Sequence, residues 1–305
     1  MAESMVASAA ERPGARSAPE VEPARASEHA FRLGLATIAV LVVRDLKRFF
    51  RQKSRVLGAL VQPLIFWLAI GSGFNASFRF PGAGAEGSVS YMSYFFPGVI
   101  VMVVLFTAIF TTLSLIEDRH QGFLQAVMVA PGARWALVLG KTLGGVTIAM
   151  VQAGIFLALA PWAGFSLGHV QWVTLLFTLL FTAVGLSALG FTLAWWLDSV
   201  QGYHAVMSVL LIPAWVLSGA MFPIERGSAW LAVAAHLNPV AYSVAAVRRA
   251  LYGGVGTAGL GTSAWLEFAV VLGFAFLTVA LGVWISRFGR VARPRRAKTA
   301  GGGAR

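Results

Sequence analysis

The chain has 305 residues, of which 58% are hydrophobic and only 12% are charged, and its mean hydropathy is +0.75. Soluble globular domains carry about 25% charged residues, so this composition excludes an ordinary soluble domain and indicates a membrane protein. The formal net charge is +12, which by itself would also suit a nucleic-acid-binding protein. There is no cysteine, so disulfides and cysteine-based metal sites are excluded.

The N-terminal segment divides into two parts. Residues 1–30 are rich in Ala, Ser, Pro, Glu and Arg without apolar periodicity, which predicts a disordered tail. Residues 31–55 are apolar and then basic at helical spacing, which predicts an amphipathic helix along the membrane interface. Its basic face could lie near anionic headgroups or against a cytoplasmic partner, and the sequence leaves both open. The basic side chains singled out on this helix are Arg44, Lys47, Arg48 and Arg51.

Six uncharged apolar runs follow, each about long enough to cross a hydrocarbon core roughly 30 Å thick as a helix. Helices are expected because lipid offers no partner for unpaired backbone groups. The predicted fold class is therefore an all-α integral membrane protein with a six-span domain over residues 56–286 and a basic cytoplasmic tail over 287–305. The six runs are 56–74, 94–116, 142–160, 172–197, 205–224 and 268–286.

The placement of Lys and Arg sets the expected orientation. With six crossings, twenty of the 24 basic residues fall on one side of the membrane and four on the other. Cytoplasmic loops carry the excess of positive charge, so both termini are expected in the cytoplasm. The basicity is thus explained by membrane topology, and no nucleic-acid partner is predicted.

Two features of the spans predict packing and local structure. Gly140, Gly144 and Gly145 lie at the start of the third span, where small residues allow another helix to approach closely. Between the fifth and sixth spans, apolar residues mix with charged ones. That segment is expected to form short helices that enter the outer interface without crossing.

The sequence shows neither a complete nucleotide-binding loop nor an acidic residue in the middle of a span. Gly140, Lys141 and Thr142 resemble the end of a phosphate-binding loop, but Trp135 occupies the position of the required earlier glycine. No acidic residue lies in the middle of a span, which argues against a carrier driven by an ion gradient. The chain is therefore not expected to be an enzyme or to bind a cofactor or metal.

A polar island at residues 117–141 separates the second and third spans, and it resembles the first cytoplasmic loop of type-2 ATP-binding-cassette (ABC) export permeases, especially the daunorubicin-resistance and multidrug branch. The residues that carry this resemblance are Glu117, Asp118, Arg119, Gly122, Phe123, Leu124, Pro131 and Arg134. The outer segment is similar to a second signature of the same family. Its matching residues are Ser218, Gly219, Pro223, Asn238, Pro239, Tyr242 and Arg248.

The resemblance implies a subunit of the cell (inner) membrane that pairs with a second permease chain, identical or different, and with a cytoplasmic ATPase that binds ATP and magnesium. It implies that the island is a coupling helix seated in the ATPase, with the helix of residues 41–55 beside it. Asp198 is either a second ATPase contact or a residue that ends a helix. The expected function is export of a hydrophobic drug-like or lipid-like molecule. The alternatives are export of a polysaccharide or lipid-linked glycan, and a membrane scaffold or channel without an ATPase.

Overall fold

The computed structural model describes residues 23–75, 79–81, 88–124, 127, 134–224, 227–254 and 260–288. Nearly all of these residues are helical, and one two-stranded antiparallel sheet joins β1 to β2. The helices are α1 Pro23–Arg51, α2 Lys53–Asn75, α3 Tyr91–His120, α5 Arg134–Leu157, α6 Trp172–Trp196, α7 Val200–Val216, α8 Ala229–His236, α9 Pro239–Leu251 and α10 Ala264–Phe288. The strands are β1 Arg79–Pro81 and β2 Ser88–Ser90.

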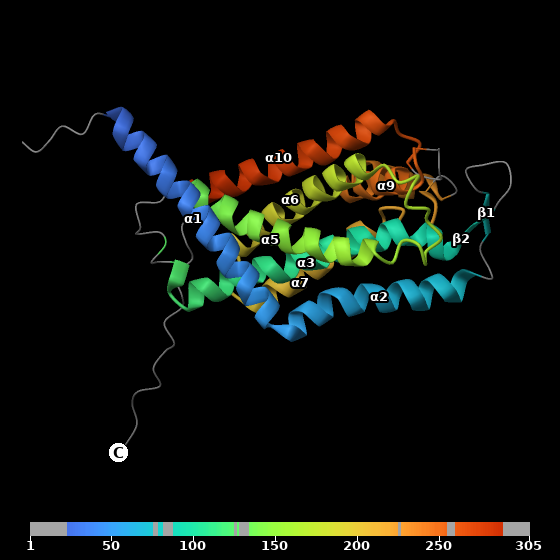
Figure 1. The fold of residues 1–305 in the computed structure, drawn as a ribbon, viewed down its shortest axis with the longest axis horizontal. Coiled ribbons are helices and arrows are strands. Elements are labelled where there is room, and N and C mark those ends of the chain that lie inside the picture. Colours follow the sequence, from blue (N-terminus) through green and yellow to red (C-terminus); the bar gives the residue numbers. More distant parts are fainter. Residues whose placement is uncertain are drawn as a thin grey trace, which may run out of the picture.

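The long helices form one bundle whose axes run in the same general direction, and α1 crosses one end of it (Figure 1). Five helices are long and apolar enough to cross a membrane, namely α2, α3, α5, α6 and α10. In α3, 89% of the apolar window is buried inside the chain, against 22% in α2 and 28% in α10. The bundle is therefore built around α3, while α2 and α10 expose most of their apolar surface.

The fifth predicted span is shorter than expected, because α7 has only 17 residues and ends at Val216. The chain nevertheless continues along α3. The indole of Trp215 donates to the carbonyl of Gly98 (2.8 Å), and Tyr91, the first residue of α3, donates to the carbonyl of Met221 (2.8 Å). Helix α7 and the turn after it thus reach the start of α3. By length and composition, the described residues contain five candidate spans, or six if α8 and α9 together form one bent span.

The N-terminal helix differs from its predicted bounds at both ends. It begins at Pro23, inside the segment predicted to be disordered, and ends at Arg51, so that Lys53 already belongs to α2. Residues 1–22 lie outside the described residues. The predicted close approach at the third span is confirmed, because a Cβ built on Gly140 would lie 2.8 Å from Leu41 Cδ1 of α1.

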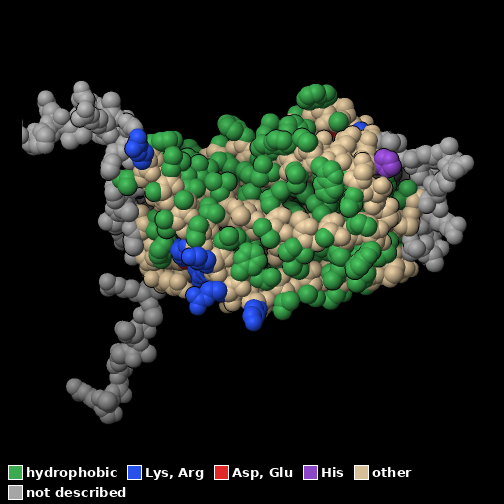
Figure 2. Space-filling view, in the orientation of Figure 1, with side chains coloured by type: hydrophobic (Ala, Val, Ile, Leu, Met, Phe, Trp, Pro, Cys, Tyr) green, Lys and Arg blue, Asp and Glu red, His purple; other side chains and the backbone are tan. Residues whose placement is uncertain are grey.

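The two ends of the bundle differ in composition. We call the end crossed by α1 the α1 end; it also holds the C-terminal end of α10, because Arg134 of α5 donates to the carbonyls of Ser286 and Arg287. Figure 2 shows hydrophobic side chains over the middle of the bundle and Lys and Arg side chains gathered near α1. The opposite end holds the sheet and the short helices α8 and α9, which meet at an angle of 88° where the short outer helices were expected.

Candidate functional site

The acidic start of the polar island belongs to α3, which continues to His120. Asp118 is completely buried; it accepts hydrogen bonds from Lys141 Nζ (2.6 Å) and Arg48 Nη1 (2.8 Å), and it is also paired with Arg44. Glu117 accepts from Arg48 Nη2 (2.7 Å). The two carboxylates therefore bind the basic face of α1, and the coupling role that the resemblance implies for them stays a prediction.

Lys141 lies at the centre of this arrangement and is 4% exposed. Its ammonium group donates to Asp45 Oδ2 (2.9 Å), Asp118 Oδ2 (2.6 Å) and Ser114 Oγ (3.2 Å). All three donors are satisfied, which is the condition under which a buried charge can be tolerated. We call Arg44, Asp45, Arg48, Glu117, Asp118 and Lys141 the ion-pair cluster. It joins α1, α3 and α5.

Sequence reasoning missed two members of the cluster. In the sequence, Lys141 only marks the end of the polar island and completes an imperfect phosphate-binding loop, and neither pattern predicts its acidic partners. Asp45 was not singled out, although it is the one acidic residue in residues 31–55. A lone acid inside a strongly basic helix was the available signal, because it needs a cation from elsewhere in the fold.

Arg119 holds the end of α6. It is 3% exposed and donates to the carbonyls of Ala194, Trp195 and Leu197 and to Asp198 Oδ1, at distances between 2.9 and 3.1 Å. These carbonyls belong to the last turn of a helix, which has no intrahelical donors of its own. Arg119 thus fixes the C-terminal end of α6 to α3, and Asp198 shares in that helix-end role.

The rest of the island is only partly described. Gly122 adopts φ +75°, Phe123 lies under the Arg44 guanidinium at 3.7 Å, and Leu124 is buried. Arg134 is the first residue of α5 and contacts the end of α10. Pro131 and most of the expected coupling helix lie outside the described residues, so that helix stays a prediction.

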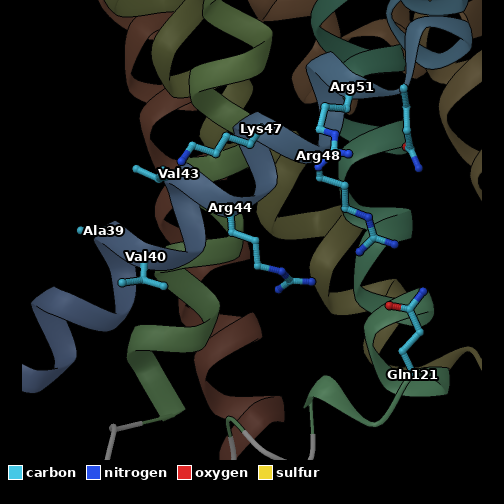
Figure 3. Close-up of a pocket in the computed structure, with 9 residues that line it drawn as sticks. Ala39, Val40, Val43, Arg44, Lys47, Arg48, Arg51 and Gln121 are labelled. Carbon is cyan, nitrogen blue, oxygen red and sulfur yellow. The ribbon is translucent and has the colours of Figure 1, made fainter.

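The four basic residues predicted on α1 divide into two pairs. Arg44 and Arg48 turn toward the end of α3, whereas Lys47 and Arg51 are exposed (Figure 3). Together they line an open groove of about 900 Å³. The remaining lining residues are Ala39, Val40, Val43, Gln52 and Gln121.

At the opposite end, the residues of the outer signature meet around the turn after α7. Gly219, at φ +77°, accepts hydrogen bonds at its carbonyl from Tyr94 Oη (3.0 Å) and Arg248 Nη2 (2.9 Å). The Arg248 guanidinium is 2% exposed and lies 4.1 Å from the centre of the Tyr94 ring. Arg248 therefore binds α9 to α3 and to the end of α7.

The other signature residues support the same turn. Asn238 caps α9 by accepting from the Val240 amide (3.0 Å), and its own amide donates to the carbonyl of Ala214. Tyr242 donates to the carbonyl of His236 (3.0 Å). Three further positions complete the set: Ser218 donates to the Trp215 carbonyl, Pro239 is the first residue of α9, and Pro223 lies in the turn before Ile224.

A third feature is a narrow lateral cleft of about 60 Å³ between α2, α3 and α7. Its polar side chain is the exposed Gln62. The other lining residues are Phe66, Met102, Leu105, Phe106, Ile212 and Trp215. As for metals, no group of three His, Asp or Glu side chains that could hold an ion occurs in the described part of the chain.

A bundle of apolar helices with charged residues confined to its ends defines a multi-pass membrane protein. The chain matches the family described as ABC-2 type transporter over residues 36–252, and it belongs to that family. It is accordingly a membrane permease subunit of an ABC exporter.

Named relatives agree with this family. The putative transport permease ycf38 of Cyanophora paradoxa is 26% identical over 246 residues, which cover 80% of each chain. The daunorubicin resistance permease protein DrrB1 of Streptomyces coeruleorubidus is 26% identical over 229 residues, 74% of this chain and 79% of that protein. The probable multidrug permease YbhR of Escherichia coli K12 is 28% identical over 155 residues, half of this chain and 42% of that protein.

Proposed function

We propose that this permease exports a hydrophobic drug-like or lipid-like molecule from the cytoplasm, using ATP that a separate cytoplasmic subunit binds with magnesium and hydrolyses. The α1 end then faces the cytoplasm of a cell whose inner membrane holds the chain. The distribution of Lys and Arg supports this orientation, because α1 alone carries six of the twenty basic residues that the positive-inside rule assigns to that side, and the end of α10 carries a seventh.

The observation that carries the proposal is the way in which both flanks of the polar island are tied to α1. Asp118 lies near the end of α3, where the island starts, and Lys141 lies in α5, where the island ends. Lys141 binds Asp45 of α1, and Asp118 binds Arg44 and Arg48 of α1. A force on the island therefore reaches three helices through buried ionic contacts. Such contacts break at a high free-energy cost, so they suit transmission of force between the coupling helix and the spans.

The surface offered to the ATPase begins on α1. Its N-terminal part projects beyond the ends of the other helices (Figure 1). Along α1, Phe31, Leu35, Val40 and Val43 are between 49% and 65% exposed. Apolar side chains gathered outside the hydrocarbon mark a protein contact. Phe123 of the island lies beside this helix, 3.7 Å from the Arg44 guanidinium.

Introducing charge on this apolar surface tests the ATPase contact. The double variant Val40→Asp/Val43→Asp is expected to weaken binding of the co-expressed ATP-binding subunit by on the order of tenfold or more, because central apolar contacts dominate interfaces. Co-purification and permease-stimulated ATP turnover in nanodiscs are the measurements. Val40→Leu/Val43→Leu is the matched control and should behave as the parent. Full ATPase binding by the Asp variant would refute the contact.

The nature of the cargo is inferred from the lateral cleft. Gln62 lies in an apolar membrane helix and is exposed, although an unpaired amide in hydrocarbon is unfavourable. A cargo or a second permease chain would supply its partner. The cleft holds about 60 Å³, far below the roughly 300–1,000 Å³ of pockets that take drug-sized ligands, so a drug-sized molecule needs a second wall or an outward movement of α2.

The second permease chain would supply that wall. Val209 and Leu210 of α7 are 77% and 46% exposed next to the cleft residue Ile212, which leaves an apolar face for a second copy or a related chain. The apolar and aromatic lining favours a hydrophobic cargo over a glycan. The similarity to DrrB1, a daunorubicin resistance protein, and to YbhR, a probable multidrug permease, supports the same class.

Gln62→Leu tests the cleft. With daunorubicin as the fluorescent probe in inside-out vesicles, we expect the KM for ATP-dependent uptake to rise several-fold, since a single hydrogen bond to a cargo contributes about 1 kcal/mol. Leu57→Ala, a truncation of a 59%-exposed residue of α2 that does not line this cleft, is the control. Equal KM values for parent and Gln62→Leu would place the cargo elsewhere, and absence of uptake by the parent would favour the glycan alternative.

A further inference from the structure

The charges around the α1 groove do not balance. The groove and the ion-pair cluster together contain five cations and three carboxylates. The carboxylates are bound by Arg44, Arg48 and Lys141. The two cations left over are Lys47 and Arg51, which are exposed and have no carboxylate partner among the described residues. The basic half of the groove therefore carries an excess of two positive charges.

The position of these two cations relates them to the membrane. Arg51 is the last residue of α1, and the apolar span of α2 begins five residues later at Val56. Lys47 lies one helical turn before Arg51, so both belong to the part of α1 nearest the span. In the orientation of the proposed function this is the level of the cytoplasmic headgroups, where each Lys or Arg contributes about 1 kcal/mol to the attraction of anionic lipid.

The groove also offers polar groups that suit a phosphate. Gln52 and Gln121 line it beside the arginines, and their amide groups can donate to phosphate oxygens. Figure 3 shows Arg44 and Arg48 directed toward the end of α3 that carries Gln121. A phosphate on this side would therefore touch α1 and α3 at once. No acidic side chain lines the groove to repel it.

From these observations we propose that the basic half of the α1 groove, at Lys47, Arg51, Gln52 and Gln121, binds the phosphate of an anionic phospholipid from the cytoplasmic leaflet. The bound lipid holds α1 against the end of α3, next to the coupling segment. The site rests on the proposed orientation of the chain, but its ligand is a lipid and not the ATPase, whose proposed contact is centred on Val40 and Val43 of the same groove.

Lipid retention by the purified permease alone tests the site. Native mass spectrometry in the presence of phosphatidylglycerol and phosphatidylcholine should show preferential retention of phosphatidylglycerol. Lys47→Gln/Arg51→Gln should weaken it roughly 5-fold for each cation removed, and on the order of 30-fold for both. The matched control is Lys53→Gln/Arg287→Gln, which removes two exposed cations that do not line the groove. The control should retain the lipid as the parent does.

The possible outcomes separate the proposals. Equal retention by the Lys47/Arg51 variant and the control would overturn the site and show only a general attraction to charge. Displacement of the lipid by inorganic phosphate at millimolar concentration would also overturn it, because the ligand would then be a free anion. Normal lipid retention with loss of ATPase binding in the Val40/Val43 variant would show that the two halves of the groove act independently.

Discussion

Replacing Lys141 with methionine is expected to be the most damaging single substitution in the chain. It would leave the buried carboxylates of Asp45 and Asp118 without the ammonium group that lies 2.9 and 2.6 Å from them. Removing one partner of a buried ion pair costs about 3–5 kcal/mol. We expect a melting temperature lower by many degrees in detergent, measured by tryptophan fluorescence, and little folded protein from the membrane.

A double-mutant cycle shows whether this effect arises from the ion pair. Asp45→Asn removes one of the orphaned charges, so Lys141→Met/Asp45→Asn should be less destabilised than the sum of the two single variants, with a coupling of about 0.5–3 kcal/mol. Asp118 keeps its contacts to Arg44 and Arg48 in that background. Strict additivity of the two single effects would mean that Lys141 and Asp45 do not interact as the structure shows.

The sequence predicted the helical class and most of the spans because hydrophobic length is a local property. The predicted bounds of the fifth span, however, differ from those of α7, and the reason is physical. The apolar run of residues 205–224 is continuous, yet the helix ends at Val216, where the Leu217 amide still bonds to the carbonyl of Pro213 and the following turn is fixed by Tyr94 and Arg248. Contacts from α3 and α9 decide that boundary, and composition does not report them.

The functional residues were predicted in part. The outer signature singled out Gly219, Asn238 and Arg248, and the structure brings all three together around the end of α7. At the α1 end the residue types were found but not their partners. The sequence singled out Arg44 and Glu117 without assigning either a partner within the chain, whereas Arg44 pairs with Asp118 and Glu117 with Arg48, about seventy residues apart in the sequence. Pairings over such separations follow from the fold and not from periodicity.

The contact between α1 and α5 can be changed without substituting a charged residue. Along α5, Gly140 and Gly144 replace side chains with backbone, so α1 lies close enough for Asp45 to reach Lys141. The glycines and the ion-pair cluster are thus two parts of one contact. If α1 transmits force from the ATPase, filling the glycine position should uncouple ATP hydrolysis from export while the spans remain folded.

Gly140→Val is the variant that tests this idea. Its Cβ would lie 2.8 Å from Leu41 Cδ1, 3.1 Å from Leu41 Cβ and 3.3 Å from Ile38 Cα, so the buried Leu41 side chain must move and α1 must give by a few tenths of an ångström, at a cost of about 1–3 kcal/mol. Gly154→Val on the same helix is a matched control, because a Cβ there meets nothing within 4 Å. We expect faster hydrogen–deuterium exchange in α1 and at least a several-fold loss of transport per ATP for Gly140→Val only. Unchanged coupling despite a displaced α1 would exclude the helix from force transmission and leave the island to act on α3 and α5 directly.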